Sequence, residues 1–136
     1  MIVASMLFYG CEPDDDGHQF ITIINNSDNK VRVQEVWSSK ISNTDTLWRC
    51  GHAALSLESN TSRMFESLHH DWEEDFNYIP FIQFLVFDAE VYDSMRDYDI
   101  PCSEVDYTIP VLHYYQLKLE DLERMNWEVM YPPSEE

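Results

Sequence analysis

The stretch FIQFLVFD, residues 81–88, is the most apolar run in the chain. It is bounded by Pro80 and Asp88, and its length is typical of a strand rather than of a buried helix. A strand with apolar residues at successive positions is usually covered on both faces. The run therefore predicts a central strand, and with it a fold organised around a β-sheet.

Residues 18–25, HQFITIIN, alternate with the period of a strand. Phe20 and Ile24 share one face, and Ile21 and Ile23 share the other, so this strand is expected to be apolar on both faces. Residues 54–67 contain two short apolar stretches around the sequence Asn-Thr-Ser and predict a hairpin. The other expected strands, by alternation or by β-branched and aromatic composition, lie at 30–38, 54–59, 63–67, 109–117 and 127–131.

Short helices are expected at 69–78, 89–99 and 118–126, where apolar or acidic residues recur at helical spacing. Asn126 suits the left-handed conformation that ends many helices, and Trp127 is expected to bury a large area as the chain turns back. These elements predict a mainly β fold, a single-domain β-sandwich of about seven strands with two or three short connecting helices. The alternative is an α+β fold with its helices on one sheet face.

Length and charge restrict the possible functions. The chain has 136 residues, which fits one domain, and is 44% hydrophobic, which excludes a disordered chain. Twenty-six Asp and Glu against eight Lys and Arg give a formal net charge of −18. This charge repels phosphate backbones and anionic lipid headgroups, so nucleic acid is excluded as a partner. No cofactor is expected, because the sequence contains no Gly-rich phosphate loop and no GxSxG motif.

The N-terminus resembles the export signal of bacterial lipoproteins. Residues 2–9, IVASMLFY, form an apolar run that ends at Gly10-Cys11, and EPDDDG follows. The resemblance implies that Cys11 is lipidated, and the acidic residues after it resemble the surface-export signal of Bacteroidetes lipoproteins. The expected division of the chain is a signal-peptide remnant (1–10), an acidic tether (11–17), a β-rich domain (18–131) and a frayed tail (132–136). The alternative is an ordinary first strand with a buried Cys11.

The segments 114–133, YYQLKLEDLERMNWEVMYPP, and 84–95, FLVFDAEVYDSM, resemble small lipoproteins of Bacteroidales bacteria. That family often has Thr or Ser where Lys118 stands, so the cap of the C-terminal helix is expected to be weaker here. The resemblance implies a lipid-anchored protein of the bacterial outer membrane, periplasmic or surface-exposed. It implies no particular activity. The matching positions are Leu117, Leu119, Asp121, Leu122, Asn126, Trp127, Tyr131 and Pro132.

Three groups of side chains are candidates for chemistry or binding. Cys50 and Cys102 could form a disulfide in an exported chain, or remain as two buried thiols. His70 and Glu74 lie four apart on one face of a predicted helix and are weak candidates for metal ligands. Trp48 and Trp72 stand in polar or loop contexts and could face a ligand.

These observations predict a lipid-anchored envelope protein that carries a non-enzymatic binding domain. Its expected partner is a protein or a glycan that the sequence does not identify, and the lipid anchor is its expected contact with the membrane. The alternatives are a hydrolase that uses acidic residues and a module that binds a divalent metal. Two close carboxylates in a cleft would favour the hydrolase, and a converging set of His and Asp would favour the metal.

Overall fold

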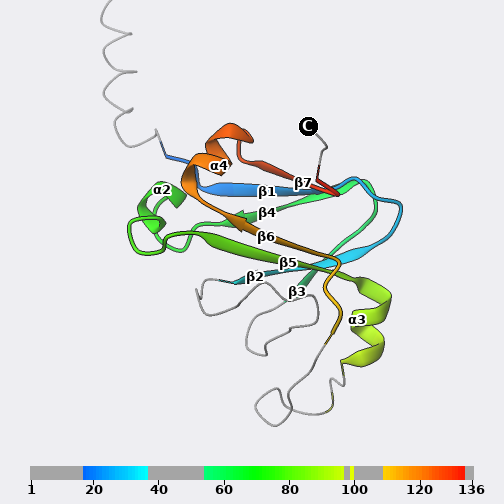
Figure 1. Ribbon diagram of the computed structural model, residues 1–136. Coiled ribbons are helices and arrows are strands. Elements are labelled where there is room, and N and C mark those ends of the chain that lie inside the picture. The colour runs from blue at the N-terminus through cyan, green and yellow to red at the C-terminus, as the bar shows by residue number, and fades with distance from the viewer. Residues whose placement is uncertain (1–16, 37–53, 97–98, 100–108, 134–136) are drawn as a thin grey trace, which may run out of the picture.

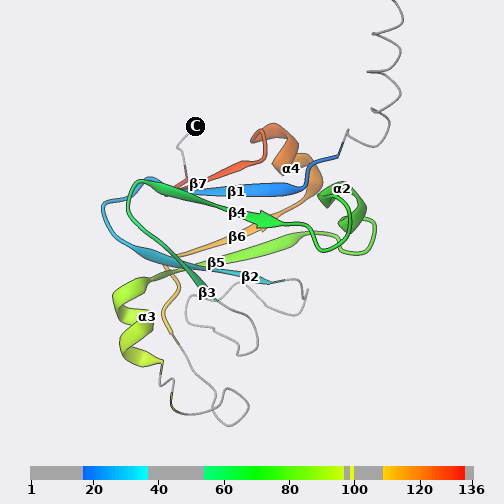
Figure 2. The same ribbon diagram turned by 180° about the vertical axis from the view of Figure 1, so that it is seen from behind.

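The computed structural model describes residues 17–36, 54–96, 99 and 109–133. This part of the chain forms seven strands in two sheets and three short helices, so the predicted mainly β class is confirmed (Figures 1 and 2). One sheet has the order β4-β1-β7, with β1 at Phe20–Asn25, β4 at Thr61–Glu66 and β7 at Glu128–Tyr131. The other has the order β3-β2-β5-β6, with β2 at Val31–Val36, β3 at Ala54–Leu57, β5 at Ile82–Asp88 and β6 at His113–Leu117.

Strand β5 is the central strand that residues 81–88 predict. It pairs antiparallel with β2 on one side and with β6 on the other. Phe84 and Val86 contribute to the core between the two sheets, whereas Leu85 and Phe87 belong to a second cluster on the other face. All four side chains are fully buried. An unbroken apolar run is the pattern that burial on both faces requires.

The core between the sheets contains side chains from all seven strands and from two of the helices. Trp72 and Leu122 are the fully buried helical residues of this core. Helix α2 (Trp72–Asp75) and helix α4 (Leu119–Arg124) therefore close one end of the sandwich, as Figure 1 shows. Helix α3 (Ala89–Met95) covers part of the outer face of the four-stranded sheet, where Tyr92 packs in the second cluster.

The predicted hairpin over residues 54–67 is wrong. Strand β3 pairs with β2 in the four-stranded sheet, whereas β4 pairs with β1 in the three-stranded sheet. The turn between β3 and β4 thus crosses from one sheet to the other, and the turn between β1 and β2 does the same. A local sequence pattern marks a turn but does not specify which strands pair across it.

Asn25 joins the two crossing turns. Its side chain is fully buried at the end of β1, and its Nδ2 donates hydrogen bonds to the backbone oxygens of Asn29, Leu57 and Glu58 at 2.8, 3.1 and 3.1 Å. Its Oδ1 accepts hydrogen bonds from the backbone N–H and the hydroxyl of Ser27. One amide side chain therefore holds both chain reversals against each other.

The first and last strands of the fold lie side by side and run parallel. The register places Ile23 of β1 opposite Val129 of β7, and both are fully buried. The hydroxyl of Tyr115 on β6 donates to the backbone oxygen of Met130 at 2.6 Å, which joins the edge strands of the two sheets. Burial raises the pKa of Tyr115, so this hydroxyl keeps its proton.

The C-terminal helix follows the sequence prediction closely. Lys118 precedes α4 without a side-chain cap, but its backbone N–H donates to the Asp121 carboxylate at 2.9 Å, so half of a capping box is kept. Asn126 has a φ of 59°, the left-handed conformation expected of it. Trp127 follows with a φ of 62°, which is uncommon for a bulky residue, and its side chain is buried as predicted.

Asp121 provides a test of acid stability. The pKa of its carboxyl is held below the ordinary value, first by the hydrogen bond from the Lys118 backbone and then by Arg124, 2.9 Å away. A lowered folded-state pKa stabilises the fold above the unfolded pKa, and this contribution is lost as the pH falls through the folded value. We therefore expect Asp121→Asn to lower the free energy of unfolding at about pH 6.5 more than at about pH 3, below the usual carboxyl pKa. Urea unfolding at both pH values measures the difference; equal losses would contradict the prediction.

Several predicted features lie outside the described residues. These are the lipidation site Cys11, the possible disulfide partners Cys50 and Cys102, and Trp48. Among the described helices, none is long and apolar enough to cross a membrane.

Candidate functional site

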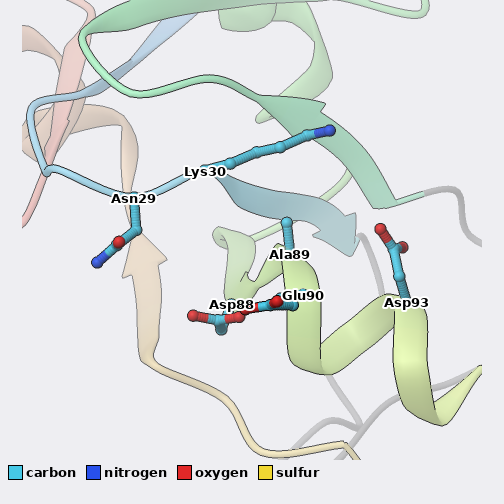
Figure 3. Close-up of a pocket in the computed structure, with 6 residues that line it drawn as sticks. All are labelled: Asn29, Lys30, Asp88, Ala89, Glu90 and Asp93. Atoms are coloured by element: carbon cyan, nitrogen blue, oxygen red, sulfur yellow. The ribbon is translucent and has the colours of Figure 1, made fainter.

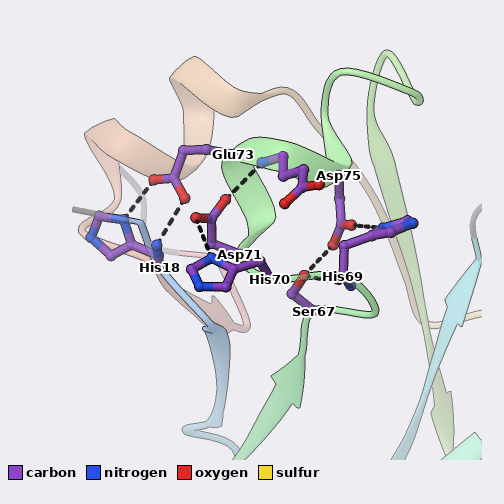
Figure 4. Close-up of polar contacts among 8 residues, drawn as sticks. His18, Ser67, His69, His70, Asp71, Glu73 and Asp75 are labelled. Carbon is purple, nitrogen blue, oxygen red and sulfur yellow. Dashed lines mark hydrogen bonds and ion pairs between the residues drawn. The ribbon is translucent and has the colours of Figure 1, made fainter. Parts of the chain in front are cut away.

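Three histidines and several carboxylates meet at the end of the sandwich where α2 lies, and they come from α2, from the segment before it and from the segment before β1 (Figure 4). Trp72 anchors this end, and its placement corrects a prediction. It is fully buried in the core, and its Nε1–H donates to the backbone oxygen of Phe65 at 3.2 Å. Trp72 therefore cannot face a ligand. A short helix with acidic residues on its outer side directs its large apolar side chain inward.

A buried carboxylate fixes one of the histidines. Asp75 is fully buried, and its Oδ2 accepts a hydrogen bond from the Ser67 hydroxyl at 2.5 Å, while its Oδ1 contacts Nδ1 of His69. The His69 side chain is half exposed, and the centroid of its ring lies 5.4 Å from the centroid of the exposed Tyr78 ring. When Nδ1 carries the proton that the carboxylate accepts, Nε2 of His69 is a hydrogen-bond acceptor.

His18 is held on the other side of α2, as Figure 4 shows. Its backbone N–H and its Nδ1 contact the two carboxylate oxygens of Glu73 at 2.8 and 2.7 Å. Its ring stacks on Trp127, with the ring centroids 4.2 Å apart and the planes 11° from parallel. These contacts tie the segment before β1 to α2 through Glu73 and to the start of β7 through Trp127.

His70 and Glu74, which the sequence suggests as metal ligands, come together with a third residue. His70, Asp71 and Glu74 each offer a ligand atom, and these atoms lie within 4.8 Å of one another. Asp71 also caps α2, because its Oδ1 accepts the backbone N–H of Glu74 at 2.8 Å. This hydrogen bond is the main reason that the pKa of Asp71 lies below its ordinary value. The sequence contains the signal for Asp71, an Asp placed at a helix start.

Gly17 offers a direct test of this cap. A Cβ at position 17 would lie 2.1 Å from Oδ2 and 2.6 Å from Cβ of Asp71, so Asp71 would have to move. We expect Gly17→Ala to displace the cap and to lower the free energy of unfolding by about 1 kcal/mol, the usual loss for an N-cap. Urea unfolding measures it. In an Asp71→Gly background, which lacks both the carboxylate and the Cβ of Asp71, the same change should cost little, and a full additional loss there would contradict the stated cause.

A depression of about 350 Å³ lies where the β1–β2 turn meets α3 (Figure 3). Two of its charged groups, Asp88 and Asp93, already serve the fold. Asp88 caps α3 by accepting the Val91 N–H at 3.0 Å, and Asp93 binds Nε of Arg32 at 2.8 Å. We therefore assign the depression a structural role at the start of α3.

The outer face of the three-stranded sheet exposes an apolar side chain on each of its three strands. We define the outer face as Phe20, Thr22, Ile24, Ser62, Met64, Glu66, Glu128 and Met130, which the strand register places on the side away from the core. Met64 is 59% exposed, Phe20 39% and Met130 37%. No helix among the described residues lies across this face (Figures 1 and 2). The exposed apolar groups thus lie on all three strands of one face, with Thr22 between Phe20 and Ile24 on β1.

The sequence carries a signal for this surface. Residues 18–25 predict a strand that is apolar on both faces, and the structure buries Ile21 and Ile23 in the core while Phe20 and Ile24 point outward. The outward half of the pattern is normally polar in a sheet that faces water. No local sequence pattern predicts the outer face, because β4 and β7 reach β1 only in the folded chain.

Comparison of the chain with protein-family models, with curated proteins and with solved structures found no match.

Proposed function

We propose that this chain is a lipid-anchored protein of the bacterial outer membrane whose β-domain binds another molecule and catalyses no reaction. The observation that carries the binding function is the outer face, where Phe20, Ile24, Met64 and Met130 form an apolar surface on a rigid sheet. Exposed apolar patches of this kind, bordered by polar residues, are typical of interaction sites.

The anchoring half of the proposal rests on the sequence around Cys11. An apolar run, a small residue before the cysteine and an acidic stretch after it are the expected order of signal, attachment point and tether. The net charge of −18 disfavours direct adsorption to anionic membrane lipids, so the lipid attached to Cys11 would hold the protein at the membrane. Strand β1 begins at Phe20, which leaves the tether between the lipid and the first strand.

Mass spectrometry of the N-terminal peptide, after expression in the native host, tests the anchor. We expect Cys11 as the first residue with lipid mass added. An intact segment from Met1 to Gly10 followed by an unmodified Cys11 would overturn it.

Photo-crosslinking in the native host tests the binding surface. A photoreactive amino acid at Met64 should give an adduct of discrete mass, whereas the same group at Glu90 on α3 should not. The adduct should disappear when Met130→Asp places a charge on the opposite edge strand of the same face. An adduct that is equally strong from both positions, or that survives Met130→Asp, would contradict binding through the outer face.

Divalent metal binding is a second candidate, favoured by the approach of His70, Asp71 and Glu74 within 4.8 Å. One imidazole and two carboxylates suit Zn²⁺ with water as the remaining ligand. Calorimetric titration with Zn²⁺ alone should detect a site that His70→Ala and Glu74→Gln each weaken at least tenfold. His113→Ala, which removes an imidazole from β6, is the matched control. Equal affinity in all variants would place the metal elsewhere on the acidic surface and contradict this candidate.

A further inference from the structure

We propose that the outer face receives a cationic amphipathic helix of a partner protein, which lies along β1 between the carboxylates of Glu66 and Glu128. The inference rests on the proposed binding function and adds the chemistry of the partner. It follows from the arrangement of apolar and charged residues across the three strands, from the width of the sheet and from the charge of the chain.

The strand register fixes the arrangement of the surface. Phe20 lies opposite Glu66, and Thr22 lies between Met64 and Glu128. In the next row, Ile24 lies between Ser62 and Met130. The apolar side chains therefore cross the sheet from Met64 on one edge strand to Met130 on the other, and Phe20 and Ile24 extend this surface along β1.

The size of the surface matches one helix. Neighbouring strands are about 4.8 Å apart, so the distance from β4 to β7 is about 10 Å, close to the diameter of a helix with its side chains. Strand β1 has six residues, about 20 Å of extended chain, which corresponds to about three and a half helical turns. A helix that places an apolar stripe on β1 can reach the carboxylates on both edge strands with residues that flank the stripe. Exposed methionines adapt their shape to such a helix.

Charge selects a cationic partner. Glu66 and Glu128 are exposed and lie on opposite edge strands, and no residue of the outer face is basic. Arg63 of β4 points away from this face, where its guanidinium donates to the backbone oxygen of Ser56 at 3.2 Å. A second copy of the chain would bring like carboxylates and a like net charge of −18 to the contact, so self-association is disfavoured. Lys or Arg beside the apolar stripe would instead meet carboxylates.

Synthetic peptides test this inference on the purified full chain. The probe is a fluorescently labelled helical peptide of Leu and Lys with one apolar face. A Leu and Glu peptide with the same pattern and a Leu and Lys peptide with the pattern scrambled are the comparisons. Fluorescence anisotropy measures the Kd of each peptide. The measurement is made at about 150 mM salt, which screens long-range attraction between charges. We expect the amphipathic Lys peptide to bind at least tenfold more tightly than either comparison.

Two pairs of variants locate the binding. Met64→Ser with Met130→Ser should raise the Kd of the Lys peptide at least tenfold, whereas Met95→Ser with Leu112→Ser, which alters exposed apolar residues elsewhere, should leave it unchanged. Glu66→Gln with Glu128→Gln should raise the Kd about fivefold and flatten its salt dependence. The matched control for charge is Asp28→Asn with Glu90→Gln, which removes the same number of acids away from the face.

The outcomes separate this inference from the proposed function. Equal binding of the Glu peptide through the methionines would overturn the cationic partner and leave the outer face as a binding surface. Equal binding of the scrambled peptide, or equal effects of the two charge-variant pairs, would show attraction to net charge alone and overturn the inference. Binding that the methionine variants do not weaken, or no binding at all, would also overturn it. Dimerisation of the parent chain that Met64→Ser abolishes would assign the face to a second copy.

Discussion

An Asn25→Asp variant is expected to lose about 3–5 kcal/mol of unfolding free energy, the usual loss when a buried charge has no counterpart. The amide Nδ2 of Asn25 faces three backbone oxygens, and the site is fully buried. The variant puts a carboxylate oxygen where that donor stood, so an acceptor with a negative charge faces three other acceptors. Urea unfolding followed by circular dichroism measures the loss.

Two further variants keep this prediction testable if Asn25→Asp does not fold. Asn25→Ala removes the donor without adding charge and should give an intermediate loss, because the three backbone oxygens then lack their partner. Asn26→Asp makes the same chemical change at the next, exposed position and should change stability by less than about 0.5 kcal/mol. If Asn25→Asp and Asn26→Asp were equally stable, Asn25 would not be what holds the two turns together.

A Trp72→Ala variant is expected to lose about 3–5 kcal/mol, the range measured for large aromatic residues removed from cores. Trp72 is fully buried, so its loss leaves a cavity beneath α2 and removes the donor to the Phe65 oxygen. Trp72→Phe should lose less, because the ring of Phe fills part of the space. Thermal and urea unfolding measure the loss of unfolding free energy in both variants, and the loss should be larger for Trp72→Ala than for Trp72→Phe.

The same series distinguishes a core residue from a ligand-facing one. Tyr78→Ala is the matched control, since Tyr78 lies after the same helix and is 70% exposed. It should change the unfolding free energy by less than about 1 kcal/mol. A Trp72→Ala variant as stable as Tyr78→Ala would contradict the placement of Trp72 in the core.

The sequence predicts the elements of this fold better than their pairing. All seven expected strands are found, because alternation and apolar runs report how each short segment is buried. The false hairpin at 54–67 and the parallel contact of β1 with β7 have one cause, since strand partners depend on segments far apart in the chain. Asn25 illustrates the limit. Its role depends on carbonyl groups more than thirty positions away in the sequence.

The sequence also predicts the parts of the candidate site that lie close together in the chain, but not the contacts between distant segments. The spacing of His70 and Glu74 places them on one helical face, and the structure adds Asp71 through its role as the helix cap. The pair of His18 and Glu73 is separated by 55 positions and has no local signal. The polar sequence neighbours of Trp72 predict an exposed side chain, and this prediction is wrong because the short acidic helix packs against the core through Trp72.

The parallel contact between β1 and β7 also sets the order in which the protein can be completed. The three-stranded sheet lacks one edge until Glu128–Tyr131 have been made and have joined β1, so the outer face is complete only after β7 is in place. Contacts between segments so distant in sequence place a domain among the slower folders, with times of about milliseconds to seconds. A chain that stopped before Glu128 would leave the edge of β1 bare, and bare edges recruit strands from other molecules. Strand β7 thus protects an edge of β1 that would otherwise be open to strands from other molecules.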